Sequence, residues 1–267
     1  MAMVMAMVMA IMAIRKRKIN KFMIDIHCHI LPNVDDGSKS LDETRDLLYM
    51  AKSEGISDVV ITPHFSKPDG FIVNADTLNT LFEELKNNCK DIGVNLYLGN
   101  ELMIDKSLDD LLTDSKILSL NGSRYVLVEF PFGGYKREFD DYLMNIALSG
   151  YKIIIAHPER YKWAVDNPDN YIDRWIDNGY FIQCNNGFVD NSIQRKFVFK
   201  LIENQKIHFI ASDAHNKNRP LSLEEAYKLI AKKFDEEVSK VLFIENPSRL
   251  LENKEIINIK KIKRHLF

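Results

Sequence analysis

The feature that most limits the fold of this chain is an alternation of short apolar runs with helix-like stretches. The apolar runs are nearly continuous, as in residues 58–62 (DVVIT), 125–130 (YVLVEF) and 152–156 (KIIIA). Such strands are buried on both faces, which is typical of parallel sheets covered by helices. Seven or eight strand-helix units favour a barrel over an open sheet. The sequence therefore predicts an α/β barrel, and its 267 residues suit a single domain.

The expected elements follow from periodicity and from capping residues. Strands are expected at residues 22–26, 58–62, 95–98, 125–130, 152–156, 180–184, 207–211 and 241–244. Helices are expected at residues 40–55, 76–91, 137–149, 170–178, 191–204 and 222–234. The first of these helices has Ser40 as its N-cap, Glu43 to complete a capping box and Gly55 to end it.

Nearly every predicted strand is followed by, or ends in, a side chain that can bind metal. These residues are His27 and His29, Asp35 and Asp36, His64, Glu101, Glu129, His157, and Asp213 with His215. The sixth strand instead ends in Asn185 and Asn186. Because the carboxyl ends of barrel strands meet at one rim, where active sites are built, we expect these side chains to lie together.

The spacing of these residues indicates a metal site. His27 and His29 are two apart on an extended segment and leave the same face, and Asp213 and His215 repeat that spacing. Imidazoles and carboxylates without thiolates suit Mn²⁺, Fe or Zn²⁺. The candidates outnumber the ligands of one catalytic ion, which predicts two or three ions with a bridging carboxylate such as Glu101.

Each candidate taken singly also fits an ordinary role. Glu129 could be an ion-pair partner, and Asp36 followed by Gly37 could form a turn. The joint pattern favours metal, because burying so many ionisable groups together without it would cost several kcal/mol per charge.

Two arginines indicate the substrate, and the cysteines limit the chemistry. Arg160 and Arg219 lie on predicted rim loops, where a guanidinium can hold phosphate oxygens, although each could instead be a surface ion-pair partner. A cysteine phosphatase has Arg six positions after its nucleophile; those positions here hold Val34, Asn95 and Asp190. The three cysteines form no C-x-x-C pair, which fits a reducing cytoplasm.

The N-terminal sequence and the net charge argue against other classes of protein. Residues 1–14 are a Met/Ala/Val/Ile run that is followed by four basic residues. The run is too short for a spanning helix, which needs roughly 20 apolar residues. Its basic residues follow the apolar stretch, whereas those of a secretory signal precede it. We therefore expect residues 1–22 to be an extension outside the fold, residues 23–267 to form the domain, and no stable membrane insertion; a functional tail or a peripheral anchor is the alternative. A net charge of −2 without a basic tract disfavours nucleic-acid binding.

The ordered segments IDIHCHILPNVDDG, TPH, GNE, VEF, HPER and SDAH resemble the polymerase-and-histidinol-phosphatase (PHP) superfamily. Within it, VDDGS, HPER and a late IENP are most similar to the metal-dependent bacterial protein-tyrosine phosphatases of capsular and exopolysaccharide gene clusters. The resemblance covers residues 23–247, nearly the whole chain.

The resemblance implies a distorted (β/α)7-type barrel with a trinuclear site, usually of Mn²⁺. The family pattern carries onto nine residues as metal ligands: His27, His29, Asp36, His64, Glu101, Glu129, His157, Asp213 and His215. Asp36 is chosen over Asp35 from the Asp-Gly pattern. Arg160 and Arg219 match the phosphate-contacting arginines, the second after a one-residue gap.

The resemblance also implies a substrate and a partner. The expected activity is hydrolysis of phosphotyrosine by metal-bound hydroxide, and the expected partner is the C-terminal tail of a bacterial tyrosine kinase that regulates polysaccharide export. Three alternatives stay open: a small-molecule phosphoesterase such as a histidinol phosphatase, an amidohydrolase-type enzyme, and a catalytically inactive metal-bound scaffold that binds a kinase tail. The oligomeric state is not predicted.

Overall fold

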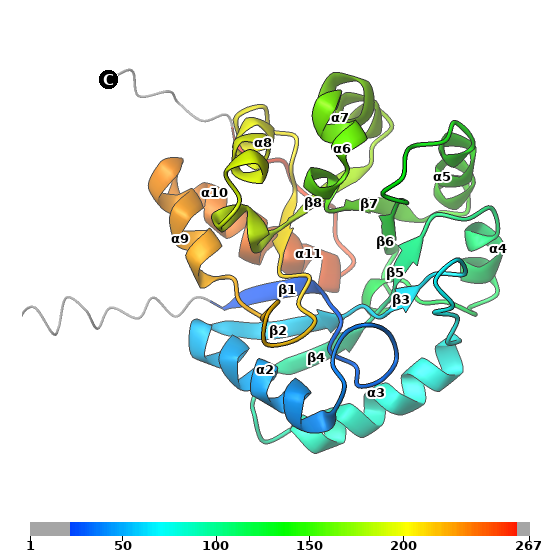
Figure 1. Ribbon diagram of the computed structural model, residues 1–267, viewed down its shortest axis with the longest axis vertical. Helices are drawn as coiled ribbons and strands as arrows, with labels where there is room; N and C mark the ends of the chain where they lie inside the picture. The colour runs from blue at the N-terminus through cyan, green and yellow to red at the C-terminus, as the bar shows by residue number, and fades with distance from the viewer. Residues whose placement is uncertain (1–21, 261–267) are drawn as a thin grey trace, which may run out of the picture.

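Two parallel sheets form the centre of the protein in the computed structural model, which describes residues 22–260 (Figure 1). The first sheet has the order β1-β2-β4 and the second the order β3-β5-β6-β7-β8-β9, with every pair parallel. The strands are β1 (Met23–Cys28), β2 (Ile56–Ile61), β3 (His64–Phe65), β4 (Asn95–Leu98), β5 (Glu101–Met103), β6 (Tyr125–Glu129), β7 (Lys152–Ala156), β8 (Phe181–Asn185) and β9 (Phe209–Ala211).

The two sheets are joined at both ends. On one side the chain passes from β2 directly into β3 and from β4 directly into β5, with two residues between the strands of each pair. On the other side, His29 N donates to Ala214 O at 2.7 Å and Asp213 N donates to His27 O at 2.8 Å. The strands therefore follow one another round a distorted barrel, as the sequence predicted.

Most helices lie outside the strands (Figure 1). The helices are α2 (Leu41–Glu54), α3 (Ala75–Cys89), α4 (Leu108–Thr113), α5 (Glu138–Leu148), α6 (Lys162–Asp166), α7 (Pro168–Asp177), α8 (Ser192–Glu203), α9 (Glu224–Lys233), α10 (Glu236–Lys240) and α11 (Asn246–Leu251). Leu250 of α11, in contrast, packs with inward-facing strand residues. Along β6, Val126 and Val128 pack in the large apolar cluster that includes the helices, while Tyr125 and Leu127 pack in a second cluster of mainly strand residues. Strand residues thus alternate between the barrel interior and the helical layer.

Helix α2 begins and ends where its capping residues predict. The Ser40 side chain accepts from Glu43 N at 3.2 Å, and Gly55 ends the helix with φ of 86°. The expected capping box is displaced by one residue, because the Glu43 carboxylate accepts from Lys39 N at 2.9 Å.

The predicted strand at residues 241–244 is wrong. Val241–Glu245 forms a π-helical turn between α10 and α11. A four-residue apolar run is equally compatible with a buried strand and with a buried helix segment, so its periodicity could not distinguish the two. The other predicted strands and helices exist, with boundaries shifted by a few residues. The short helices α4, α6, α10 and α11 and the short strands β3 and β5 were not predicted.

The predicted extension at residues 1–22 lies, but for its last residue, outside the described part of the chain. Within residues 22–260, no helix combines the length and the apolar character needed to cross a bilayer.

His208, which precedes β9, is a buried histidine that should make the stability of the fold sensitive to acid. Its Nδ1 accepts from Ile182 N at 3.1 Å and its Nε2 lies 3.1 Å from Asn258 Oδ1, partners that suit the neutral ring. Burial lowers the pKa of His208 from 6.5 to about 4. Because the folded-state pKa lies below the unfolded one, this stabilisation is present above pH 6.5 and is lost as the pH falls toward 4.

We expect the His208 contribution to the free energy of unfolding to fall by about 3 kcal/mol between pH 7 and pH 4. Urea unfolding of the chelator-treated wild type and of His208→Gln over this range measures it. A difference between the two proteins that does not change with pH would contradict this assignment.

Candidate metal centre

The nine predicted metal ligands gather at the carboxyl ends of the strands. His27 lies in β1, His64 and Glu101 begin β3 and β5, and Glu129 ends β6; His29, Asp36, His157, Asp213 and His215 lie in the loops that follow β1, β7 and β9. All are buried except Asp36, which is exposed, and His64, which is partly buried. The structure therefore brings the whole predicted set together at one rim.

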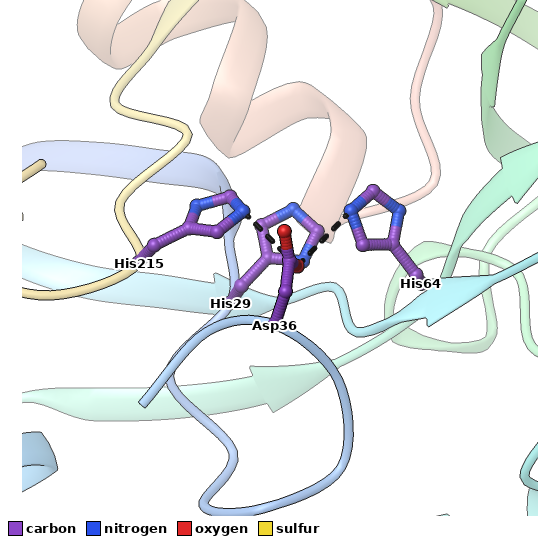
Figure 2. A group of neighbouring side chains, drawn as sticks. All are labelled: His29, Asp36, His64 and His215. Carbon is purple, nitrogen blue, oxygen red and sulfur yellow. Dashed lines mark ion pairs between the residues drawn. The ribbon is translucent and has the colours of Figure 1, made fainter. Parts of the chain in front are cut away.

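One part of this cluster is centred on Asp36. Its Oδ1 lies 3.5 Å from His64 Nε2 and 3.4 Å from His215 Nε2, and Figure 2 shows His29 between the two rings. These four residues each offer a ligand atom, all within 4.8 Å of one another. Three imidazoles and a carboxylate at this spacing are a suitable donor set for a divalent transition metal.

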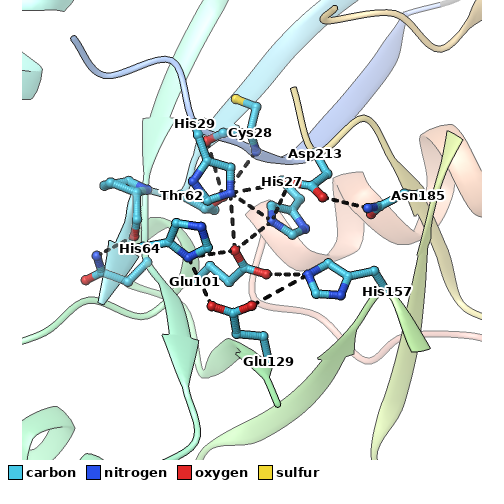
Figure 3. A network of polar contacts seen from close by, with 12 residues as sticks. His27, Cys28, His29, Thr62, His64, Glu101, Glu129, His157, Asn185 and Asp213 are labelled. Atoms are coloured by element: carbon cyan, nitrogen blue, oxygen red, sulfur yellow. Dashed lines mark hydrogen bonds and ion pairs between the residues drawn. The ribbon is translucent and has the colours of Figure 1, made fainter. Parts of the chain in front are cut away.

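The second part is centred on Glu101 (Figure 3). Its Oε2 lies 3.2 Å from the Nε2 atoms of both His27 and His29. The same oxygen is 3.1 Å from His64 Nδ1, and Oε1 is 2.7 Å from His157 Nε2. Glu101 belongs to two of the four candidate groups, one with His27 and His157 and one with His64 and Glu129, which suits a bridging carboxylate.

Several buried polar atoms in this cluster lack hydrogen-bond partners among the described residues. They include Glu101 Oε2, His64 Nδ1 and His157 Nδ1. Buried polar atoms are nearly always paired, and Glu101 Oε2 faces ring nitrogens without hydrogen-bond geometry. Cations beside Glu101 Oε2 and His64 Nδ1 would satisfy these two atoms, so the residues present fit a multi-ion site.

The electrostatics of the cluster also favour cations. Burial opposes ionisation of Glu101, but the neighbouring His27 and His64 outweigh it and hold the pKa of this carboxyl well below its usual range. Burial likewise opposes protonation of His29, but Asp35, Asp213 and Glu101 raise its pKa well above the ordinary value. Glu101 therefore stays ionised, while a proton competes with metal for His29 as the pH falls.

A second layer of side chains, which the sequence did not assign, orients the imidazoles. His29 Nδ1 pairs with Asp35 Oδ2 at 2.7 Å, and His27 Nδ1 pairs with Gln183 Oε1 at 3.0 Å. Each contact turns the opposite nitrogen, Nε2, toward the cluster. Asp35 is thus occupied with His29, which favours Asp36 as the ligand. Gln183, in β8, could have been found only by extending the search from charged strand ends to amides.

The backbone around the cluster requires special conformations. A Cβ on Gly37 would lie 1.8 Å from His29 O, so only glycine permits this approach of the Asp36 loop to β1. His157 and Asp213 have φ of 35° and 53°, a left-handed conformation that costs roughly 1–2 kcal/mol in a residue with a side chain. Such strain is found preferentially at functional sites.

The two predicted arginines meet on one ligand. Asp213 Oδ1 faces His27 and His29, whereas its Oδ2 accepts from Arg160 Nη1 at 2.9 Å and Arg219 Nη2 at 2.6 Å. Asn185 Nδ2 donates to the same oxygen at 2.6 Å. Both guanidinium groups are therefore held beside the cluster of candidate metal ligands.

A cleft of 580 Å³ opens over the cluster and the arginines. Its walls include His64, Glu129, Arg160 and Arg219, together with the aromatic rings of Phe71 and Phe132. The Phe132 side chain is 51% exposed, and the Arg160 guanidinium lies 4.9 Å from the centre of its ring. The cleft thus places cationic groups, potential metal ligands and an aromatic surface around one space.

The three cysteines lie outside this arrangement. Cys28, Cys89 and Cys184 are buried and free, and burial raises the pKa of each thiol. A buried thiol with a raised pKa is a poor nucleophile, which supports the exclusion of cysteine-based hydrolysis.

Comparisons with known proteins agree with this geometry. The family model for capsular polysaccharide synthesis, CpsB/CapC, matches residues 23–252. CapC of Staphylococcus aureus is 38% identical over 212 residues, which cover 77% of this chain and 82% of that protein. Tyrosine-protein phosphatase YwqE of Bacillus subtilis is 34% identical over 245 residues, which cover 88% and 93%.

The fold of one solved structure matches that of this chain over nearly its whole length. It comes from the crystal structures of YwqE from Bacillus subtilis and CpsB from Streptococcus pneumoniae, described as unique metal-dependent tyrosine phosphatases. The TM-score is 0.84 at 31% identity, with 90% of this chain and 98% of that chain covered.

Proposed function

This chain belongs to the CpsB/CapC family of capsular polysaccharide synthesis, and we propose that it is a metal-dependent protein-tyrosine phosphatase. One observation supports this most strongly: a single cleft is lined by two arginines and by five of the nine potential metal ligands, which together form one cluster. Metal ligands supply the means of hydrolysis and the arginines supply the means of holding phosphate.

The proposed cofactor is Mn²⁺, in two or three ions, with Fe or Zn²⁺ as alternatives. His27, His29, Asp36, His64, Glu101, Glu129, His157, Asp213 and His215 would hold them. When bound, such ions lower the pKa of water and neutralise phosphate charge.

The remaining roles belong to side chains of the cleft. Arg160 and Arg219 bind phosphate oxygens and stabilise the charge that develops during hydrolysis. Phe132 and Phe71 offer apolar surface to the ring of phosphotyrosine. Because phenolate is a better leaving group than an alkoxide, a protein acid is not essential for its departure.

The proposed partner is a phosphotyrosine protein, specifically the C-terminal tail of a bacterial tyrosine kinase that regulates polysaccharide synthesis, and the proposed location is the cytoplasm. The family description and the names of the relatives support a role in capsule synthesis.

A substrate panel tests the proposed function. Full-length protein loaded with Mn²⁺ is assayed on a phosphotyrosine peptide, a phosphoserine peptide of the same sequence and histidinol phosphate. We expect the highest kcat/KM on the phosphotyrosine peptide. Preferred turnover of histidinol phosphate, or binding of the peptide without turnover, would refute the proposal and favour the small-molecule enzyme or the inactive scaffold.

Phe132→Ala tests how the cleft recognises an aryl group. The ring lines the cleft and is half-exposed, so its loss removes apolar contact without disturbing a core. We expect kcat/KM for phosphotyrosine peptide to fall about tenfold, since an aromatic pair is worth roughly 1 kcal/mol beyond buried area. Residual turnover of the phosphoserine peptide should change little; an equal loss on both peptides would contradict this role.

A further inference from the structure

A second cavity lies beside the metal cleft and shares its two arginines. It has a volume of 450 Å³ and is lined by the turn after β7, the segment after β8 and the start of α9. Arg160 and Arg219 line both cavities, so a molecule whose phosphate reaches these arginines also lies next to the second cavity. None of the nine candidate metal ligands lines it.

The wall of this cavity includes a buried carboxyl group with few hydrogen-bond donors. Glu159 is 5% exposed, and its Oε1 accepts from Asn185 N at 2.7 Å. Its Oε2 has no N–H or O–H hydrogen-bond partner among residues 22–260, while the Cys184 thiol contacts the carboxyl group. Glu159 thus adds an acidic group to the cavity wall, although its buried Oε2 is not itself open to a ligand.

Two further carboxylates lie around the same cavity. Asp190, after β8, and Glu225, in the first turn of α9, are both exposed and line it. No lysine lines the cavity, and in the described part of the chain neither carboxylate forms an ion pair. Arg160 and Arg219 form their ion pairs with Asp213 rather than with Asp190 or Glu225.

We propose that this second cavity binds a cationic side chain, lysine or arginine, that lies close to the phosphotyrosine in the substrate polypeptide. The inference rests on the proposed phosphatase function and adds a determinant of substrate choice to it. The ligand carries its negative phosphate to the arginines and its positive group to Asp190 and Glu225, so charges of both signs are complemented. A cavity of 450 Å³ accommodates an extended side chain rather than a bare ion.

The test compares the kcat/KM values of a set of peptides, measured with each protein in turn. Phosphotyrosine peptides carry a single lysine, or glutamine in its place, at each of the three positions on either side of the phosphotyrosine. They are assayed with the Mn²⁺-loaded full chain, with the double variant Asp190→Asn/Glu225→Gln, and with Glu203→Gln, which changes an exposed acid of α8 outside the cavity. A small aryl phosphate without flanking residues reports basal activity.

We expect lysine at one or two positions to raise kcat/KM about fivefold through a lower KM, as for a partly buried ion pair. The double variant should lose this preference and keep its turnover of the aryl phosphate, whereas Glu203→Gln should keep both. Turnover of all peptides without lysine preference, or a preference that survives in the double variant, would overturn the inference alone. Absence of turnover on every peptide and on the aryl phosphate would overturn the proposed function, and the inference with it.

Discussion

Glu101→Gln should lower kcat for a phosphotyrosine peptide by about 10³-fold, because loss of a metal that stabilises the transition state costs several kcal/mol. Glu101 faces four imidazoles through its two oxygens and is 1% exposed. Glutamine keeps the shape but removes the charge that holds cations among those rings. Steady-state kinetics and metal analysis of the purified variant should therefore show both activity and metal content reduced.

Glu203→Gln is the matched control for this substitution, since it removes one carboxylate from the surface of α8. It should leave metal content and kcat at the wild-type level. Circular dichroism separates loss of metal from loss of fold. A folded Glu101→Gln protein that keeps its full metal content and its kcat would show that this carboxylate does not hold the ions.

Arg160→Lys should lower kcat/KM by about 10²-fold on every phosphate monoester, the usual effect of losing one donor to a developing negative charge. Lysine keeps the positive charge but cannot contact two phosphate oxygens through a planar fork. The substitution also removes the donor that Arg160 gives to Asp213 Oδ2, so the position of this carboxylate depends more on Arg219.

Arg137→Lys is the control, because Arg137 is exposed, precedes α5 and does not line the cleft. It should behave as wild type. A proportional loss on phosphotyrosine and phosphoserine peptides would place Arg160 at the phosphate. If Arg160→Lys kept the kcat/KM of the wild type, the phosphate-binding role would be wrong.

The sequence predicted the barrel and the candidate cluster because both depend on local pattern. Continuous apolar strands are recognisable without tertiary information, and parallel strands bring their carboxyl ends to one rim. That rule alone placed His27, His64, Glu129 and Asp213 together, although they are far apart in the chain. The family resemblance then supplied what geometry could not, the substrate.

The parts that were not predicted depend on contacts between distant segments. Asp35 and Gln183 act on His29 and His27 through side-chain geometry that no spacing rule describes. The run at residues 241–244 continues the helical stretch from α10 into α11, which a four-residue apolar run does not reveal. The hydrogen bond from Asn185 N to Glu159 likewise depends on the turn after β7 lying against the end of β8.

Metal dependence is the central claim, and reconstitution tests it most directly. The full-length protein is purified without added metal, its metal content is measured, and its phosphotyrosine hydrolysis is followed before and after dialysis against a chelator. We predict that bound divalent metal is found, that activity disappears with the metal, and that Mn²⁺ restores it. Phosphotyrosine hydrolysis that continues at full rate in protein shown to be metal-free would contradict the account.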